Sequence, residues 1–394
     1  MQGFVATGFE PVAELFAQHL EQGIERGAAL AAYHQGKPIL DIWGGESRPG
    51  AAWTQDTVAP VFSTSKGATA LVVQLLCDRG VLDVTRPVAA YWPEFAANGK
   101  GTITLEHVLT HSAGLPSFSN YQEILSHDSA EGWDRREEIV QRLAAETPEW
   151  EPGTYPGYHA VTFGWILGEV VRRAGGRPIG DLFRTEIAEP LGLDSWLGRP
   201  DGIEHRVAKL IAPLPPTDPD ELKLLAQVLG SGSITGRALV VGPSGGLDYA
   251  ADVANSATFQ QAEAPAANMI TDARSLARMY ALLGAGGTLD GVRIVSEEST
   301  VEHTRVRVEA HDVVLMKDRR YALGYMLQAD PIGRFGPNPD AFGHPGMGGS
   351  VGFADPQASV SFGYVMTQMV PALDTDERSK ALVAAVYKCL EARE

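Results

Sequence analysis

The stretch Val58-Ala59-Pro60-Val61-Phe62-Ser63-Thr64-Ser65-Lys66 joins a short apolar run to a long helical pattern. The run Val58–Phe62 has the length and composition of a short strand, and the helical pattern extends from Thr64 to Arg79. Gly80 follows directly and is expected to end that helix. The sequence therefore places Ser63 and Lys66 where a strand passes into the start of a long apolar helix.

Ser63 and Lys66 have the spacing of a nucleophile and its base. Residues three apart on a helix share a face, with Cβ atoms about 5–6 Å apart. A serine hydroxyl is a poor nucleophile until a base takes its proton, and burial at a helix N-terminus disfavours the charged form of a lysine. The free N–H groups of that N-terminus can also hold an oxyanion. A serine that only caps a helix is the commoner origin of such a spacing.

Strand patterns occupy both ends of the chain. Near the N-terminus, an amphipathic helix at Pro11–Ile24 precedes the apolar stretches Ala28–His34 and Pro38–Trp43, which Gln35-Gly36 joins as a hairpin. The C-terminal part shows strand patterns and then a closing helix, at Tyr321–Leu327, Ser350–Ala354, Val360–Met366 and Asp376–Leu390. We expect one antiparallel sheet built from both termini, with helices flanking it.

The middle of the chain is mostly helix and loop. Helical patterns occur at Leu105–His111, Arg135–Ala145, Val161–Ala174, Gly180–Glu186 and Thr271–Leu283. Residues 201–267 are proline-rich and acidic in one part and small and polar in another, which is typical of a variable insertion. We predict a single domain over 1–394, with its sheet part at about 1–62 and 268–394, its helical part at about 63–200 and the insertion at about 201–267.

Composition excludes several classes of protein. The 394 residues are 44% hydrophobic and 21% charged, which is typical of a soluble globular protein. A formal net charge of −17 argues against nucleic acid or an anionic membrane as a partner. No apolar run reaches the roughly 18 residues of a spanning helix, and Glu10 and Glu14 stand where a secretory signal would be basic and then apolar. We expect a cytoplasmic protein.

The cysteines and histidines give no sign of a metal site. Cys77 and Cys389 lie far apart and form no CxxC or Cys/His ligand pattern, so they are interpreted as two reduced thiols. The chemistry that Ser63 and Lys66 indicate needs no metal and no organic cofactor.

Two further segments have the composition of partners for a Ser/Lys site. Tyr158 lies in a loop just before the helix Val161–Ala174, where its hydroxyl could share a proton with Lys66. His344-Pro345-Gly346 begins a glycine-rich stretch that opens a C-terminal strand, and glycines there let a ligand approach the backbone closely. Considered by itself, each segment has a simpler interpretation. Tyr158 would be a packed aromatic residue, and the glycines would form a turn.

Two GxSxG matches offer rival nucleophiles. They centre on Ser244 and Ser350, and Leu239-Val240-Val241 could be the strand before the first. A nucleophile elbow needs several preceding strand–helix units and a downstream histidine, whereas the region before Ser244 is helical and rich in loops. An α/β-hydrolase that uses Ser244 therefore stays as a distant alternative.

Taken together, the motifs resemble those of the serine β-lactamase and penicillin-binding-protein superfamily, in particular the class C β-lactamase-like group that includes the family VIII carboxylesterases. The resemblance covers about residues 10–390 and is least clear over 201–265. It rests on the order Ser63–Lys66, Tyr158 and His344-Pro345-Gly346, and on the stretches Thr104–Pro116 and Gly352–Pro356. It implies the α+β fold of β-lactamases and transpeptidases.

The resemblance also implies roles for individual residues. Ser63 would be acylated, while Lys66 and Tyr158 would share the duties of general base and general acid. The backbone N–H groups of Ser63 and Met347 would form the oxyanion hole. We predict that His344, Gly346 and His159 contact the substrate, with a solvent-facing His159 as the alternative. His111 and Ser112 match a family marker and are interpreted as structural.

Two departures from the β-lactamase pattern favour neutral esters. Tyr158-His159-Ala160 lacks the asparagine of the β-lactamase Y-x-N motif, and His344 replaces a lysine. A mostly neutral histidine offers less positive charge to a substrate carboxylate. We predict a serine carboxylesterase with a small-molecule ester substrate. An acyltransferase, an amidase or a weak β-lactamase would use the same residues, and a non-catalytic binding relative is disfavoured because Ser63, Lys66 and Tyr158 are all present.

Overall fold

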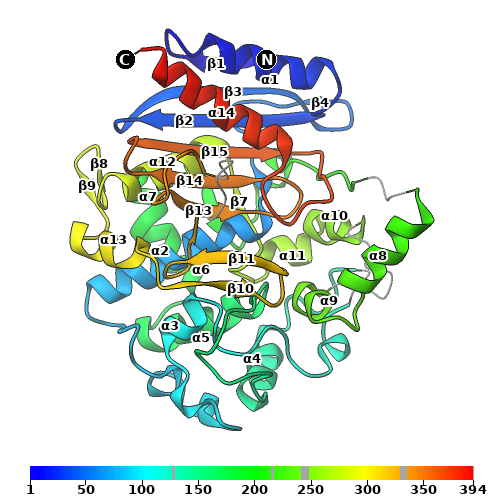
Figure 1. Cartoon of the computed structure of the whole chain (residues 1–394), viewed down its shortest axis with the longest axis vertical. Helices are drawn as coiled ribbons and strands as arrows, with labels where there is room; N and C mark the ends of the chain where they lie inside the picture. The colour runs from blue at the N-terminus through cyan, green and yellow to red at the C-terminus, as the bar shows by residue number, and fades with distance from the viewer. Residues whose placement is uncertain (127–128, 214–216, 241–247, 329–334, 394) are drawn as a thin grey trace.

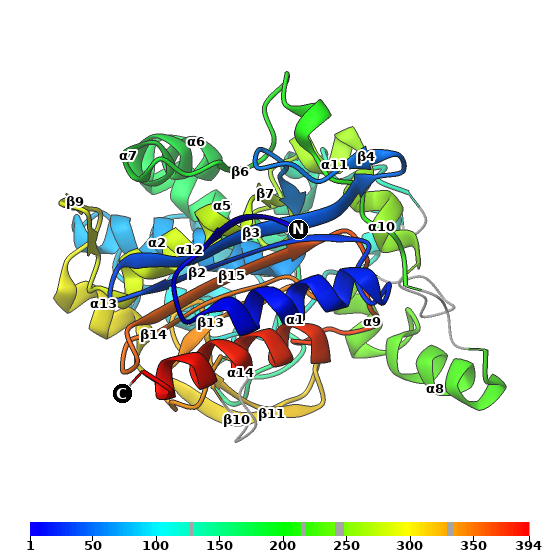
Figure 2. The same ribbon diagram turned by 90° about the horizontal axis from the view of Figure 1, so that it is seen from above.

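An antiparallel sheet forms the middle layer of the molecule, with helices on both of its faces (Figure 1). The computed structural model describes residues 1–126, 129–213, 217–240, 248–328 and 335–393. Helices α1 (Glu10–Glu21) and α14 (Glu377–Glu391) lie together on one face, and α12 (Ala273–Gly284) covers the other face, on the side of the remaining helices (Figure 2).

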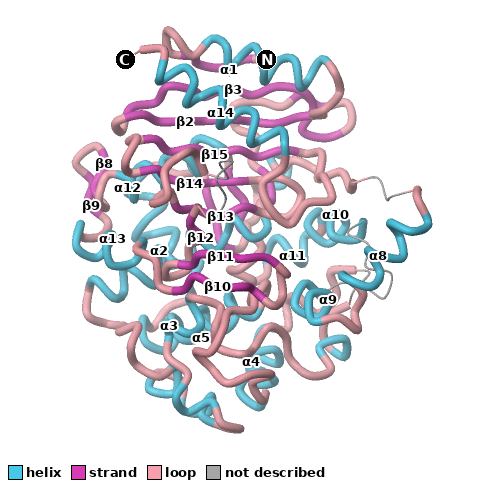
Figure 3. The backbone as a smooth tube through the Cα atoms, viewed as in Figure 1, coloured by secondary structure: helices cyan, strands magenta, loops and turns pink. Residues whose placement is uncertain are grey.

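The main sheet takes strands from both ends of the chain. Its order is β1-β3-β2-β15-β14-β13-β12-β11-β10, every neighbouring pair is antiparallel, and β4 pairs with β3. The strands are β1 (Gln2–Val5), β2 (Gly27–His34), β3 (Lys37–Arg48), β4 (Ala51–Ala52), β10 (Val308–Asp312), β11 (Lys317–Tyr321), β12 (Met326–Leu327), β13 (Phe342–Pro345), β14 (Val351–Asp355) and β15 (Val360–Met366). Figure 3 shows them as one stack that continues down to the helical region.

The pair β2–β15 closes the sheet between the two termini. Its register runs from Ala28 opposite Met366 to His34 opposite Val360, and all but His34 among these paired residues are buried. Because both faces of these strands are covered by helices, their side chains are apolar or small on both sides. The predicted antiparallel sheet built from both termini is confirmed.

Most of the helices lie between the first and the last strands. They are α2 (Ser65–Asp78), α3 (Leu105–Leu109), α4 (Arg136–Ala145), α5 (Thr162–Gly175), α6 (Ile179–Phe183), α7 (Glu189–Leu191), α8 (Pro219–Leu229), α9 (Ile234–Leu239), α10 (Asp248–Asn255), α11 (Ala257–Gln261) and α13 (Glu297–Thr304). Two small sheets accompany them: β5 (Ala59–Pro60) with β7 (Met269–Thr271) and β6 (Ser195–Leu197), and β8 (Thr288–Leu289) with β9 (Val292–Arg293). Short 3-10 turns occur at Phe62–Thr64, Val88–Ala90, Pro93–Ala96, Lys100–Thr102, Tyr121–Glu123 and Glu204–Arg206, and Arg184–Ala188 is π-helical.

Two predicted elements were wrong in extent, and one region without a predicted element is partly helical. The run Val58–Phe62 contributes only Ala59–Pro60 to a strand, because the backbone already turns at Phe62. The predicted strand Tyr321–Leu327 is a hairpin in which Tyr321 pairs with Met326, since Gly324 has a φ of +85° and reverses the chain. Residues 251–265, which show no strong pattern, contribute to α10 and contain α11, two short helices whose buried faces pattern reasoning did not detect.

A pair of glycines lets α12 approach the sheet closely. Gly352 on β14 and Gly363 on β15 lie directly opposite each other. A Cβ on Gly363 would lie 2.3 Å from the carbonyl oxygen of Ala273, and a Cβ on Gly352 would lie 2.7 Å from Cγ of Leu276. The contact with α12 therefore requires the absence of side chains at both positions.

We predict that Gly363→Ala lowers the free energy of unfolding by about 1–3 kcal/mol, because the added methyl overpacks a site bounded by helix backbone. Urea unfolding followed by circular dichroism measures the change. Gly101→Ala is the matched control, since the nearest atom to its added Cβ is 4.0 Å away. An unchanged unfolding midpoint in Gly363→Ala would contradict the close packing of α12.

Candidate active site

Ser63 lies at a strained turn between β5 and α2. Strand β5 pairs with β7, and the N–H of Val61 extends this pairing by donating to the Met269 carbonyl at 3.1 Å. Phe62 then takes a φ of +43°, in the left-handed region that residues with a side chain rarely occupy. The chain turns abruptly into α2, and the half-buried Ser63 side chain faces a pocket.

The amine of Lys66 is completely buried beside Ser63. Its Nζ lies 3.2 Å from Oγ of Ser63, 2.6 Å from the Ala160 carbonyl oxygen and 3.1 Å from the Ala266 carbonyl oxygen. Burial lowers the pKa of this amine well below its ordinary 10.5. A neutral amine has two N–H groups for the two carbonyls and one lone pair for the Ser63 hydroxyl, so this geometry suits a base.

Tyr158 lies against both of these residues. Its ring centroid is 4.7 Å from the Lys66 Nζ, and Tyr158 and Ser63 line the same pocket. Burial raises the pKa of Tyr158 above its ordinary 10, and the Ser63 side chain opposes that shift. Burial therefore holds the phenol in its neutral form.

His344, at the end of β13, contacts the other side of Tyr158. Its Nε2 lies 3.5 Å from the Tyr158 hydroxyl oxygen, and its Nδ1 lies 2.7 Å from the carbonyl oxygen of Pro345. With Nδ1–H donating to that carbonyl, Nε2 is the acceptor that faces Tyr158. The structure thus brings His344 to the predicted site, where it contacts the tyrosine.

The turn after His344 carries Met347 to the edge of the pocket. The N–H groups of Gly346, Gly348 and Gly349 donate to the carbonyl oxygens of Ser350, Ala372 and Gly346. The N–H of Met347, which lies between them, has no such acceptor in the part of the chain that the structure describes. Met347 and Ser63 both line the same pocket, as an oxyanion hole formed by their N–H groups would require.

Gly346, a predicted substrate contact, is also needed for packing. A Cβ at this position would lie 2.2 Å from the carbonyl oxygen of Val61 and 2.2 Å from Oγ of Ser350. Both its N–H and its carbonyl are used inside the turn. Gly346 therefore allows the Met347 turn to pack directly against the Ser63 turn.

His159 does not reach the pocket, which corrects the predicted contact with substrate. The ring is fully buried, with Nδ1 donating to the Gly157 carbonyl at 2.6 Å and Nε2 accepting from the Leu115 N–H at 3.0 Å. Burial lowers its pKa to about 4, so the ring is neutral. His159 connects the Tyr158 loop to the segment after α3, a role that its position next to Tyr158 in the sequence does not reveal.

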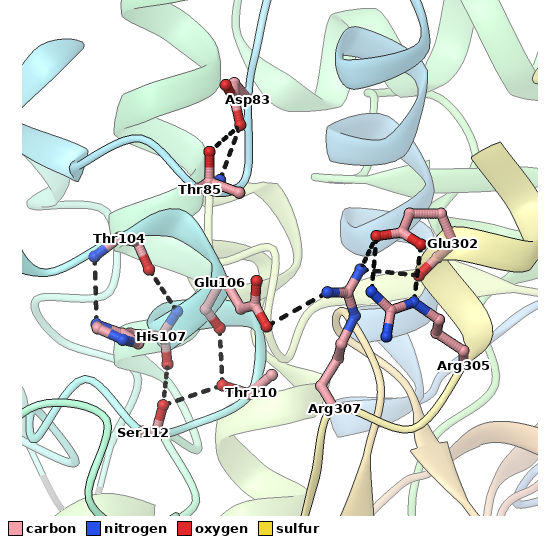
Figure 4. A network of polar contacts seen from close by, with 10 residues as sticks. All are labelled: Asp83, Thr85, Thr104, Glu106, His107, Thr110, Ser112, Glu302, Arg305 and Arg307. Atoms are coloured by element: carbon pink, nitrogen blue, oxygen red, sulfur yellow. Dashed lines mark hydrogen bonds and ion pairs between the residues drawn. The ribbon is translucent and has the colours of Figure 1, made fainter.

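The stretch Thr104–Pro116 is structural, in agreement with the interpretation of His111 and Ser112. Thr104 and His107 cap α3 reciprocally, and the Ser112 hydroxyl lies 3.0 Å from that of Thr110 (Figure 4). Figure 4 also shows Glu106 of α3 beside Arg307, which pairs with Glu302 at the end of α13. His111 has a φ of +60° and supports Tyr158, whose ring centroid lies 4.7 Å from its own.

The rival serine Ser350 is an anchor of the scaffold. Its Oγ donates to the Val61 carbonyl at 2.9 Å and lies 3.1 Å from Oγ1 of Thr64, and the side chain is buried. These contacts connect the start of β14 to the turn that presents Ser63. Ser244, the other rival, lies outside the described residues.

The pocket in front of Ser63 is apolar. It holds about 630 Å³, including its open mouth. Besides Ser63, Tyr158 and Met347, its described lining is Phe62, Trp133, Ala160, Val161, Leu239, Ala250, Val253, Phe259, Ala267, Leu315 and Leu373. Sequence reasoning missed all of these wall residues, since they come from short elements far apart in the chain and share no spacing.

The described residues contain neither a candidate metal site nor a candidate membrane span. Within them, no group of three or more histidine, cysteine, aspartate or glutamate side chains could hold a metal ion. None of their helices combines the length and apolar character that crossing a membrane requires.

Comparisons with known proteins identify the family. The family model described as Beta-lactamase matches residues 12–386. The esterase/β-lactamase LipL of Mycobacterium tuberculosis is 38% identical over 358 residues, which cover 89% of this chain and 79% of LipL.

Two solved structures are similar over almost the whole chain. The crystal structure of a family VIII carboxylesterase has a TM-score of 0.84 at 36% identity and covers 98% of this chain and 99% of its own. A penicillin-binding-protein homologue from Caulobacter crescentus has a TM-score of 0.85 at 34% identity, with the same coverage of 98% and 99%. Because sequence and fold agree over this length, the chain belongs to the β-lactamase family, and within it is similar to the family VIII carboxylesterases.

Proposed function

We propose that the protein is a serine carboxylesterase that acts through an acyl-enzyme on Ser63. The observation that carries the proposal is the contact of Ser63 with a buried lysine amine and a buried phenol at an apolar pocket. LipL and the family VIII carboxylesterase, both similar over most of the chain, are named as esterases, which supports the same reaction.

In the first step, the Ser63 oxygen attacks the ester carbonyl while its proton passes to the lone pair of the Lys66 amine. The resulting oxyanion accepts hydrogen bonds from the N–H groups of Ser63 and Met347. Removing one such donor typically costs about 100–1000-fold in rate. The alcohol leaves with a proton from Tyr158, whose phenol recovers it from Lys66.

In the second step, a water molecule takes the place of the alcohol. The Lys66 and Tyr158 pair accepts a proton from this water as its oxygen attacks the acyl carbonyl. The same pair then returns a proton to Oγ of Ser63, which releases the carboxylic acid. Because the two groups are in contact, they titrate as a coupled pair and not as two independent residues.

The pocket favours an uncharged substrate. Apart from the hydroxyls of Ser63 and Tyr158, the described lining side chains are alkyl, thioether or aromatic. A substrate carboxylate would lose its hydration there without gaining an ion pair, which is costly. We therefore assign small neutral esters as the substrate class.

We also propose that the whole chain, 1–394, forms one catalytic domain. Ser63 and Met347 come from turns at the edge of the two sheets, while Tyr158 comes from the loop before α5. The site is complete only where the sheet part and the helical part meet.

We predict that Ser63→Ala lowers kcat for a short-chain p-nitrophenyl ester by about 10⁴-fold or more, because the nucleophile is lost. Labelling by a fluorophosphonate should be lost as well. Ser244→Ala and Ser350→Ala are the matched serine controls, and both should keep the label. A labelled Ser63→Ala protein would refute the assignment of the nucleophile.

The neutral state of Lys66 has a consequence for stability. Between the lowered pKa of the folded protein and 10.5, the unfolded chain holds this amine protonated and the folded chain holds it neutral, so unfolding takes up a proton. We predict that the stability of the wild type, relative to Lys66→Met, rises with pH by about 1.4 kcal/mol per unit between the lowered pKa and 10.5. Urea unfolding at several pH values measures this slope.

The exposed Lys388 supplies the control, since Lys388→Met should run parallel to the wild type over the same pH range. If the wild type and Lys66→Met also run parallel, the amine is protonated in the folded protein and does not serve as the base.

A weak β-lactamase is the second candidate, because LipL is named as both an esterase and a β-lactamase. We predict that kcat/KM for nitrocefin is at least about 100-fold below that for p-nitrophenyl acetate, since the β-lactam carboxylate has no cation in the described pocket lining. Spectrophotometric assays on one preparation give both constants. Comparable values would favour the β-lactamase.

A further inference from the structure

A buried carboxylate lies directly behind Tyr158. Asp312, at the end of β10, is completely buried. Its Oδ1 accepts from the backbone N–H groups of Tyr158 at 3.1 Å, Val314 at 2.9 Å and Leu315 at 2.8 Å, and its Oδ2 accepts from the Tyr321 hydroxyl at 2.7 Å. All four donors are neutral.

These contacts join two parts of the site. Tyr158 supplies the phenol beside Ser63, and Leu315 lines the pocket in front of Ser63. A further bond, from the Val313 N–H to the Pro156 carbonyl at 3.1 Å, holds the same two segments together. The Asp312 carboxylate therefore connects the loop that carries the tyrosine to the turn between β10 and β11 that forms part of the pocket wall.

Burying a carboxylate with only neutral donors is costly, and an uncharged side chain could accept the same N–H groups. An asparagine, for example, presents one carbonyl oxygen in the position of Oδ1. Positioning the backbone therefore requires an acceptor at residue 312 but does not require a negative charge.

We propose that Asp312 is a positioning residue that holds Tyr158 against Ser63 and Lys66 and keeps a fixed negative charge behind them. This inference rests on the proposed esterase function. The charge favours the protonated form of the Lys66 and Tyr158 pair, and accordingly Asp312 acts to raise the pKa of Tyr158.

The other charged and titratable groups around Tyr158 do not cancel this charge. Arg319 of β11 pairs with Asp374 at 2.8 Å, so these two largely offset each other. Burial lowers the pKa of His111 well below 6.5 and that of His159 to about 4, which leaves both rings uncharged at neutral pH, and it lowers the pKa of Lys66 well below 10.5. The remaining titratable groups around Tyr158 are His344 of β13 and Tyr321 of β11. Burial raises the pKa of Tyr321 well above 10.

Two substitutions separate the charge from the geometry. Asp312→Asn keeps an acceptor for the three N–H groups and removes the charge. The acid limb of the pH profile of kcat/KM reports protonation of the Lys66 and Tyr158 pair. Without the negative charge this limb should move to lower pH by at least about half a unit. Asp312→Glu keeps the charge and displaces the carboxylate, so kcat should fall about 10–100-fold with the acid limb unmoved.

Asp355 provides a matched control. It is also completely buried and accepts hydrogen bonds from neutral donors, namely the Ala358 N–H, the Asn338 amide and the Tyr387 hydroxyl, at the end of β14. Asp355→Asn removes a comparable buried charge whose partners do not line the pocket, so it should leave the pH profile unmoved.

The results distinguish this inference from the proposed function. An active Ser63→Ala would refute the esterase assignment itself. An inactive Ser63→Ala together with an unmoved acid limb in Asp312→Asn would overturn only the role of Asp312. If Asp312→Asn does not fold, Asp312→Glu still decides, because a folded Glu variant with the kcat of the wild type would show that Tyr158 needs no positioning by Asp312.

Discussion

The burial of one amine constrains the whole site. Lys66 is completely buried, and its Nζ lies within hydrogen-bond distance of the Ser63 hydroxyl, the Ala160 carbonyl before α5 and the Ala266 carbonyl before β7. Burial disfavours the charged ammonium, and a neutral amine is satisfied by two carbonyls and a hydroxyl. Three segments that are distant in the sequence must therefore meet at this atom. Their packing buries the Lys66 amine, which lowers its pKa, and also places the amine beside Ser63.

Glycines allow this close packing because they carry no side chain. Gly346 lets the Met347 turn lie against Val61, and the paired Gly352 and Gly363 let α12 lie on the sheet behind it. Strain is concentrated at the same place, since Phe62 occupies the left-handed region immediately before Ser63. Close packing on all sides is what holds such a backbone in place.

The elements with a strong local signal were predicted well, and the pocket was not. The spacing of Ser63 and Lys66 on one helix predicted their proximity, and the atoms Oγ and Nζ are 3.2 Å apart. The strand Val360–Met366 and the helix α14 follow from their apolar periodicity. The pocket wall escaped prediction because Trp133, Val253 and Phe259 are ordinary apolar residues until packing turns them toward one cavity.

The sequence by itself determined the family, the order of the elements and the pairing of Ser63 with Lys66 where α2 begins. Periodicity and fixed spacings are local properties of a chain, so they can be detected without the fold. Only the tertiary structure decided that His159 binds backbone groups while its neighbour Tyr158 reaches Ser63. It also placed the Asp312 carboxylate 3.1 Å from the N–H of Tyr158, across 154 residues of sequence. Such contacts depend on how distant segments pack, and the free energy of that packing belongs to the whole fold and to no single motif.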